Sequence, residues 1–229
     1  MLILDNSFKI FISDEELTLL PFKSIYFEKH RTLLVSDINL CRVGHFRNSP
    51  VSLPDGLAET DLVLLDRIIN EIDISVIFIL GDLFPKNENF DMRLFNPWRE
   101  LHHNIDVNLV RENTDILSEE LYNNFEIRVH RKYFLWNKFL FTHKPLDKDI
   151  KLTGCDYVFS GYINPRVNIN GKGAALENLS CYFFDEKQCI LPAFGAINRK
   201  SLVKPTQKQR AYVIQENGNG PVVLKVDRK

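Results

Sequence analysis

The sequence has little cysteine and no long apolar run. Four cysteines occur in 229 residues, none in a C-x-x-C pair, and we expect free thiols in a reducing cytoplasm. The longest uninterrupted apolar run, residues 76–80, is far shorter than the ~20 residues that a membrane-spanning helix needs. The first residues lack the basic start and the cleavage site of a signal peptide. We therefore expect no membrane segment and a cytoplasmic location.

An excess of charge of either sign is also absent. The chain holds 29 Lys and Arg residues against 30 Asp and Glu residues, a net charge of −1. This balance argues against a generic nucleic-acid coat protein, although a local basic site is still compatible with it. Residues 195–229 hold eight bases and two acids. A solvated basic tail is the simpler interpretation of this segment, and a surface that contacts a phosphate backbone is the alternative.

The remaining composition is that of an ordinary globular domain. Hydrophobic residues make up 45% of the chain and charged residues 26%. A chain of this length buries roughly 70–75% of its unfolded surface, which gives a core without help from disulfides or metals. The sequence has no internal repeat, low-complexity run or linker rich in Pro, Gly or Ser. We expect a single domain over residues 1–229.

Five short apolar runs predict buried strands, because they are rich in β-branched and aromatic residues. They cover residues 32–35, 76–80, 107–110, 139–141 and 157–159. A helix is expected between the first two runs, and a weaker one over residues 90–102, where Pro97 would break or kink it. This alternation of strands and helices is typical of an α/β protein with a mainly parallel sheet.

The pattern changes after residue 165 to strands and turns. Runs at residues 179–184, 189–192, 212–215 and 222–226 predict a second, more antiparallel sheet. If Glu186 and Lys187 turn a hairpin, Cys189 faces Phe184 across it. Residues 1–30 are expected to add an edge hairpin.

A polar side chain able to bind a cation follows each of the five predicted strands. Taken alone, each is most often a turn, cap or loop residue. Ligands of open α/β sheets bind outside the carboxyl ends of the strands. Five such residues in order therefore predict one site, made of Asp37, Asp82, Asn113, His143 and Asn164.

The motifs around these residues resemble those of the calcineurin-like metallophosphoesterases, and among them the bacterial DNA-ligase-associated phosphoesterases. The superfamily pattern is D-x-H, G-D, G-N-H-[DE], a single His and G-H-x-H. The matching segments here are residues 37–39, 81–82, 112–115, 142–143 and 161–164, and residues 33–37, 45–47, 98–100 and 191–196 resemble the subfamily. The resemblance implies an α/β fold of two packed mixed β-sheets flanked by helices, the αββα sandwich.

The resemblance also implies a metal site, with departures. In such enzymes two ions share the central carboxylate, here Asp82. One ion would use Asp37, Asn39, Asp82 and Asn164, and the other Asp82, Asn113 and His143, with Tyr162 in the position of a further ligand. Asn39, Tyr162 and Asn164 stand where the family has histidines, and Thr114 occupies the position of the catalytic His.

These departures weaken the expected chemistry. Imidazole suits Zn, Fe and Mn, whereas carboxylate and amide oxygens suit Mg, Mn and Ca. We expect no cofactor, or one weakly bound Mg²⁺ or Mn²⁺. The catalytic His is worth ~10²–10⁴ in rate, and loss of even an outer partner of a metal ligand costs ~10–100-fold. We therefore expect little or no hydrolysis of phosphodiesters by the two-metal route.

Three further residues are candidates for contact with substrate. Lys144 follows His143, and its ammonium could substitute for a missing cation, although an ordinary surface lysine is the simpler interpretation. His45 and Arg47 could contact a phosphate at the rim, and an exposed helix start fits them equally well. The adjacent His102 and His103 diverge by about 100° on a helix, so we expect both on the surface.

Three functions stay open. The first is a catalytically impaired metallophosphoesterase that binds phosphate, nucleic acid or protein; the family context links it to bacterial DNA repair with a DNA ligase or helicase-exonuclease partner. The second is a slow Mg- or Mn-dependent phosphoesterase or nuclease. The third is a structural interaction subunit whose cleft is vestigial.

Overall fold

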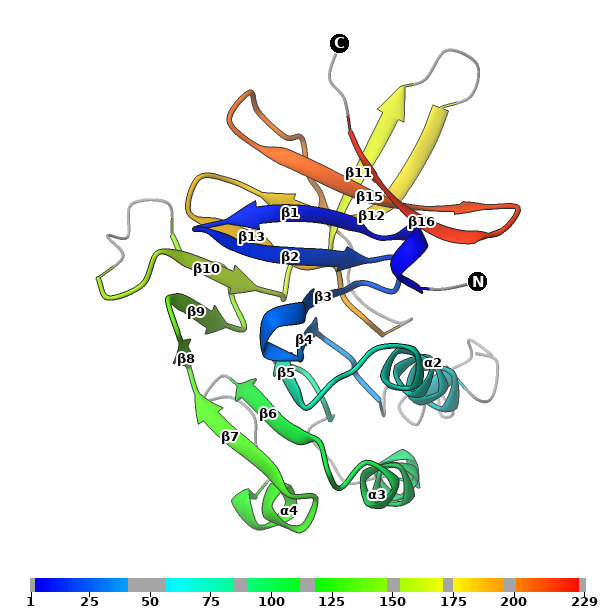
Figure 1. Ribbon diagram of the computed structural model, residues 1–229, viewed down its shortest axis with the longest axis vertical. Coiled ribbons are helices and arrows are strands. Elements are labelled where there is room, and N and C mark those ends of the chain that lie inside the picture. Colours follow the sequence, from blue (N-terminus) through cyan, green and yellow to red (C-terminus); the bar gives the residue numbers. More distant parts are fainter. Residues whose placement is uncertain are drawn as a thin grey trace, which may run out of the picture.

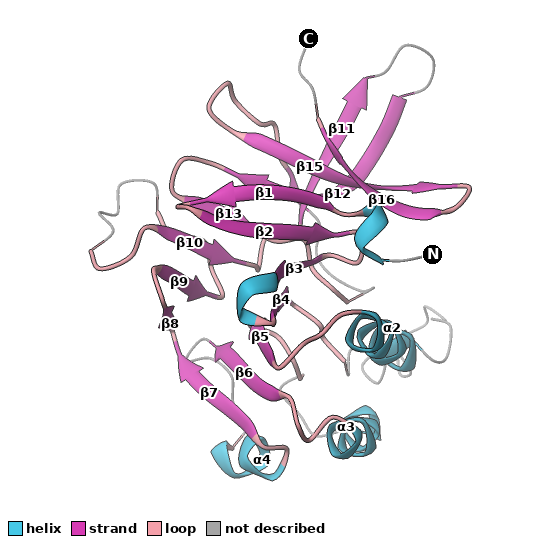
Figure 2. Ribbon diagram, in the orientation of Figure 1, coloured by secondary structure: helices cyan, strands magenta, loops and turns pink. Residues whose placement is uncertain are grey.

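The computed structural model describes residues 3–40, 57–84, 90–111, 118–147, 153–170, 175–195 and 201–226. Its strands form two mixed sheets that pack against each other, and helices cover the outer face of the first sheet (Figures 1 and 2). This arrangement is the predicted α/β sandwich.

The first sheet contains seven strands in chain order. They are β1 (Phe8–Ile12), β2 (Glu15–Leu20), β3 (Ser24–Phe27), β4 (Thr32–Ser36), β5 (Val76–Leu80), β6 (Asp106–Arg111) and β7 (Ile127–Arg131). Strands β1 to β4 pair antiparallel, and β4 to β7 pair parallel. The predicted hairpin at the N-terminal end is thus a meander of three strands at the edge of this sheet.

The second sheet contains nine strands, β14-β11-β12-β13-β10-β9-β8 in order, with β15 paired to β12 and β16 paired to β15. They are β8 (Tyr133–Trp136), β9 (Phe139–Thr142), β10 (Tyr157–Ser160), β11 (Pro165–Asn170), β12 (Ala175–Phe184), β13 (Gln188–Ile190), β14 (Ser201–Leu202), β15 (Arg210–Asn217) and β16 (Gly220–Lys225). Phe184 pairs with Cys189 across β12 and β13, as the hairpin prediction requires.

The five predicted strands are divided between the two sheets. β4, β5 and β6 are parallel neighbours in the first sheet, whereas β9 and β10 are parallel neighbours in the second. The change of sheet follows β7, where β8 pairs antiparallel with β9. Apolar runs show only that a strand is buried on two faces, so they do not assign it to one sheet or the other.

The helices in the described ranges are α2 (Leu57–Glu71), α3 (Phe90–Leu101) and α4 (Glu119–Asn124), with short 3₁₀ turns η1 (Ile3–Asn6) and η2 (Glu28–His30). Leu62 and Leu65 of α2, together with Ile72 just past its end, are buried in the core against the first sheet. Pro97 lies inside α3, which continues to Leu101, so this proline does not end the helix.

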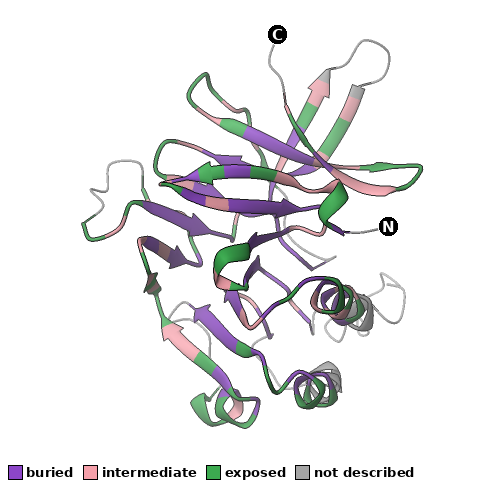
Figure 3. Cartoon of the chain, viewed as in Figure 1, coloured by how far each residue is buried: buried purple, intermediate pink, exposed green. Residues whose placement is uncertain are grey.

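Aromatic side chains fill the layer between the two sheets. Phe27 and Phe78 from the first sheet meet Phe139, Phe141 and Phe159 from the second, with ring centroids 5.0–6.3 Å apart in the cross-sheet pairs. Each of these rings is buried, and burial of such a side chain contributes ~1.5–3 kcal/mol. Figure 3 shows long stretches of strand in both sheets as buried. This layer holds the ends of β4, β5, β9 and β10 close together.

The basic segment at the C-terminal end is part of the second sheet. Arg210 and Lys225 are exposed on β15 and β16, and Lys208 pairs with Glu186 at 3.0 Å. The exposure of these bases agrees with a solvated basic segment, and the pairing of β15 and β16 holds that segment in the fold.

Cys155, Cys181 and Cys189 are free thiols, as predicted, and burial raises the pKa of Cys181 to about 12. In the described ranges, none of the helices has the length and apolar character that crossing a bilayer requires.

Candidate metal centre

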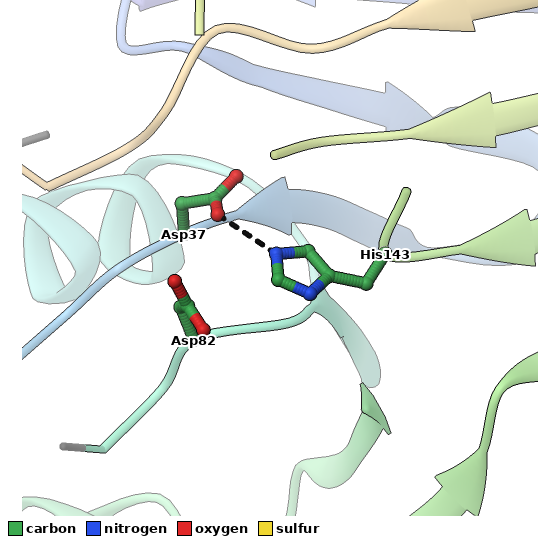
Figure 4. A group of neighbouring side chains, drawn as sticks. All are labelled: Asp37, Asp82 and His143. Atoms are coloured by element: carbon green, nitrogen blue, oxygen red, sulfur yellow. Dashed lines mark hydrogen bonds and ion pairs between the residues drawn. The ribbon is translucent and has the colours of Figure 1, made fainter. Parts of the chain in front are cut away.

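Three potential metal ligands meet at the carboxyl ends of strands from both sheets. Asp37 follows β4, Asp82 follows β5 and His143 follows β9 (Figure 4). One ligand atom from each lies within 4.8 Å of the other two. Asp37 and His143 are buried, and Asp82 is half-buried. Packing of the two sheets therefore gathers, at one point, side chains that are up to 106 residues apart in the chain.

The backbone on both sides of this group takes an uncommon conformation. Asp37, Asn39 and Asp82 have φ values of 48°, 56° and 38°, in the left-handed region that non-glycine residues rarely adopt. The Asn39 N–H donates to the Asp82 carbonyl at 2.7 Å, and the Leu40 N–H donates to the Leu83 carbonyl at 3.1 Å. These bonds hold the two loops side by side, and strain of this kind gathers at functional sites.

Asp37 is held by hydrogen bonds at both carboxylate oxygens. His143 Nε2 lies 3.0 Å from Oδ1, and the Tyr162 N–H donates to Oδ2 at 2.8 Å. Because the carboxylate is an acceptor, His143 Nε2 carries the proton of the first bond. Coordination of a cation by that nitrogen would require this proton to move, either to Nδ1 or to water, and the hydrogen bond to Asp37 to break.

Two carboxylates and one imidazole suit a divalent cation such as Mn²⁺, and the carboxylates alone suit Mg²⁺. The donor set therefore fits one ion. The resemblance distributes Asp37 and His143 over two ions, whereas the structure joins them directly through a hydrogen bond.

The chain matches no protein-family model and no curated protein. Among solved structures, it is similar to the crystal structure of Pseudomonas putida nuclease MPE, with a TM-score of 0.74 and 26% sequence identity over 91% of this chain and 96% of that chain. The chain has a metallophosphoesterase-like fold. A protein of unknown function from Aquifex aeolicus, AQ665, matches with a TM-score of 0.39 and 16% identity over 62% of this chain and 81% of that chain, which is too low to support any conclusion.

Two of the three asparagines predicted as ligands, Asn39 and Asn164, lie at the same end of the metallophosphoesterase-like fold. Asn39 is half-buried, next to Asp82 through its backbone hydrogen bond. Asn164 is buried with φ of 50°, and its Oδ1 accepts a hydrogen bond from the Ala193 N–H at 3.2 Å. Asn164 therefore also holds the segment after β13 against the end of β10.

Tyr162 and Lys144 lie at the rim of the metal centre. The Tyr162 side chain is 51% exposed, and its ring stands edge-on to His143 with centroids 5.3 Å apart. Lys144 is exposed, with its Nζ 5.2 Å from the Tyr162 ring centroid. The structure therefore places Lys144 at the surface beside the strand end.

Three glycines allow the close packing under the metal centre. A Cβ on Gly81 would lie 2.1 Å from the His143 ring, and one on Gly161 would lie 2.5 Å from Asp37 Oδ2. A Cβ on Gly195 would lie 2.0 Å from the Ile38 carbonyl oxygen. In the sequence, Gly81 and Gly161 stand out only as the glycines of the G-D and G-H-x-H patterns, because no local feature of a sequence indicates contact with a distant strand.

The remaining predicted residues fall into two groups. His45, Arg47, Asn113 and Thr114 lie outside the described residues. His103 is exposed as predicted, but His102 is buried, and the expectation of a surface position is wrong. His102 lies past the end of α3, where its Nε2 reaches Asp66 of α2 at 2.5 Å, because the two helices pack side by side.

Proposed function

We propose that the chain binds phosphoesters at the group of Asp37, Asp82 and His143 together with one weakly held divalent cation. We further propose that it hydrolyses them poorly by the two-metal route. The observation that supports the first part is the convergence of three ligand atoms within 4.8 Å in a metallophosphoesterase-like fold. A phosphoester is the ligand class because the fold resembles that of a nuclease.

Weak binding follows from the chemistry of the neighbouring side chains. Asn39 and Asn164 offer neutral amide oxygens where imidazoles are expected, and the Asn164 oxygen already accepts a backbone hydrogen bond. Tyr162 is half exposed beside the imidazole of His143. Two carboxylates and one imidazole leave several positions of a six-coordinate ion to water.

Asp37, Asp82 and His143 would have different roles in binding the cation. Asp82 and Asp37 supply the negative charge that attracts a cation, and their left-handed backbone fixes where that charge lies. His143 Nε2 hydrogen-bonds to Asp37 Oδ1 and would release this proton, or move it to Nδ1, when it coordinates the ion. A bound divalent cation would polarise a phosphoryl oxygen and lower the pKa of its bound water.

To test the proposal, the protein is dialysed against a chelator and reloaded with Mn²⁺, and its hydrolysis of bis-p-nitrophenyl phosphate is measured. We expect a rate at least a hundredfold below that of an intact metallophosphoesterase, because the catalytic His alone is worth ~10²–10⁴. Asp106→Asn is the matched control for Asp82→Asn, since Asp106 is exposed at the amino end of β6. Turnover within tenfold of an intact enzyme would contradict impaired catalysis.

A slow Mg- or Mn-dependent phosphoesterase or nuclease is the second candidate function. The retained group of Asp37, Asp82 and His143 favours it, because a site without any use for a cation has no need to keep two carboxylates together. In this case Asp82→Asn abolishes the residual activity, whereas Tyr162→Phe and Asp106→Asn barely change it. Activity that survives Asp82→Asn would come from another site or a contaminant.

A link to DNA repair, with a DNA ligase or a helicase-exonuclease as partner, is a separate proposal. It is supported by the family resemblance of the motifs and by the nuclease that shares the fold. Co-purification of the tagged chain with each purified candidate tests it. Failure of both candidates to co-purify at micromolar concentration would reject the partner proposal and leave the phosphoester proposal intact.

A further inference from the structure

A groove of about 290 Å³ lies beside the metal centre. We call it the lysine groove, and it is lined by Lys132, Tyr133, Leu140, Thr142, Lys144, Pro145 and Leu146. Lys132 and Lys144 are exposed, and the described lining contains two cationic side chains and no acidic one. Such a lining fits an anionic ligand.

The lysine groove is connected to the metal centre by the end of β9. Tyr133 of β8 pairs with Thr142 of β9, and Thr142 directly precedes His143. The Thr142 hydroxyl donates to the Lys144 carbonyl at 2.8 Å, which fixes the turn that carries the lysine. Side chains alternate along a strand, so Leu140 and Thr142 face away from the inter-sheet core that contains Phe141. The groove therefore lies on the outer side of the second sheet, one residue from the metal ligand.

Two exposed aromatic rings lie along the same path. Tyr162 is 51% exposed and Tyr133 is 60% exposed. Tyr162 is held firmly for a surface residue, because its N–H donates to Asp37 and its ring packs edge-on to His143. Lys144 contacts the Tyr162 ring and also lines the groove, so it connects the two features.

Cationic side chains along a groove with exposed aromatic rings beside them form the kind of surface that binds unpaired nucleotides, with phosphates on the cations and bases on the rings. We propose that the lysine groove holds the strand that flanks the reacting phosphoester. Lys144 and Lys132 contact its phosphates, and Tyr162 and Tyr133 stack its bases. This inference rests on the proposed function, because the reacting phosphoester itself would lie at Asp37, Asp82 and His143.

Fluorescence anisotropy in EDTA tests the groove without any need for metal or turnover. The probes are a fluorescein-labelled eight-nucleotide thymidine strand and an abasic strand of the same length. We expect the wild-type protein to bind the thymidine strand more tightly than the abasic strand. Equal affinity for the two strands, or no binding of either at low salt, would overturn the proposal.

Substitutions separate the two kinds of contact. Tyr162→Ala is expected to weaken binding of the thymidine strand roughly five- to hundredfold and to leave the abasic strand unchanged, because stacking is worth ~1–3 kcal/mol per base. Tyr162→Phe and Tyr162→Trp should restore the preference, which a purely structural role of the hydroxyl would not allow. A preference that survives Tyr162→Ala would contradict the stacking role.

The lysines should act on both probes alike. Lys132→Ala and Lys144→Ala are each expected to weaken both strands and to reduce the slope of log K against log salt by about 0.7, the value for one phosphate contact on a single strand. Lys225→Ala, an exposed lysine on β16, is the control and should leave the slope unchanged. Unaltered slopes in both groove variants would overturn the phosphate contacts.

The two proposals fail in distinguishable ways. Loss of the groove pattern with normal Mn²⁺ binding rejects only the groove. Absence of Mn²⁺ binding with an intact groove pattern in EDTA rejects only the proposed metal-dependent function.

Discussion

The imidazole of His143 packs directly against the α-carbon of Gly81. A Cβ at Gly81 would lie 2.1 Å from Cδ2 and 2.2 Å from Cγ of that ring. Gly81 also has φ of +74°, and it directly precedes Asp82. One residue therefore both turns the chain toward a carboxylate and makes room for the imidazole that lies beside it.

Gly81→Ala should be strongly destabilising, since the ring of a buried histidine would have to move. Gly154→Ala is the matched control, because Gly154 has φ of +81° and a Cβ there would meet no neighbouring atom within 4 Å. We expect Gly81→Ala to lower the free energy of unfolding in urea by at least about 2 kcal/mol more than Gly154→Ala does. Equal losses in the two variants would show that backbone strain alone accounts for the glycine.

Gly161→Ala should act on Asp37 by contact alone. A Cβ there would lie 2.5 Å from Asp37 Oδ2 and 2.6 Å from the Ser36 Cβ. We expect Mn²⁺ binding to weaken by tenfold or more. Changing a residue that only supports a metal ligand already lowers metal affinity ~10–100-fold, and this substitution displaces the ligand itself. Gly218→Ala, which has open space around it, should leave the titration unchanged. Unchanged Mn²⁺ affinity in Gly161→Ala would show that Asp37 is not a ligand of the ion.

The environment of His130 should make the protein less stable in mild acid. Burial, with a smaller contribution from Arg128, lowers the pKa of His130 below its ordinary value. Its Nε2 bonds to Asn108 Oδ1 at 2.9 Å, and its ring lies 3.9 Å from that of Phe134. The unfolded chain therefore binds a proton at about pH 6.5 that the folded chain does not bind until lower pH.

The stability from His130 is thus complete above the unfolded pKa and decreases as the pH falls through about 6.5 toward the folded pKa. Urea titrations from pH 8 to pH 5 should show a smaller decrease for His130→Gln than for the wild type. His103→Gln, at an exposed position, should follow the wild type. Parallel curves for the wild type and His130→Gln would contradict the assignment.

The contact between Asp66 and His102 should contribute more than a surface ion pair. His102 is buried, so Asp66→Ala leaves its ring nitrogen without the partner at 2.5 Å, at a cost of ~1–3 kcal/mol. The exposed pair of Asp73 and Arg31 at 2.6 Å is the comparison, and Asp73→Ala should cost at most ~1 kcal/mol. Urea unfolding measures both, and a smaller loss for Asp66→Ala would refute the structural role of this contact.

Much of the fold could be predicted from local pattern. The apolar runs at β4, β5 and β6 and the hairpin pairing of Phe184 with Cys189 are short-range properties of the chain, and the structure has them. The division of the strands between two sheets could not be predicted, because it depends on which strand faces pack against each other. Pro97 illustrates the same limit, since the helix around it continues to Leu101.

The candidate site could be predicted in part, for a physical reason. Asp37, Asp82 and His143 each follow a strand, and the carboxyl ends of strands meet. The lysine groove had no such signal, because Lys132 and Tyr133 reach Lys144 only through the antiparallel pairing of β8 with β9. The burial of His102 was missed likewise, since its partner Asp66 lies 36 residues away.

A calorimetric titration of the chelator-treated protein with Mn²⁺ tests the central claim most directly. The account predicts one ion per chain, bound weakly enough to be removed by dialysis, with binding lost in Asp82→Asn and kept in Asp106→Asn. Two ions per chain that survive dialysis, or a titration that Asp82→Asn leaves unchanged, would contradict it.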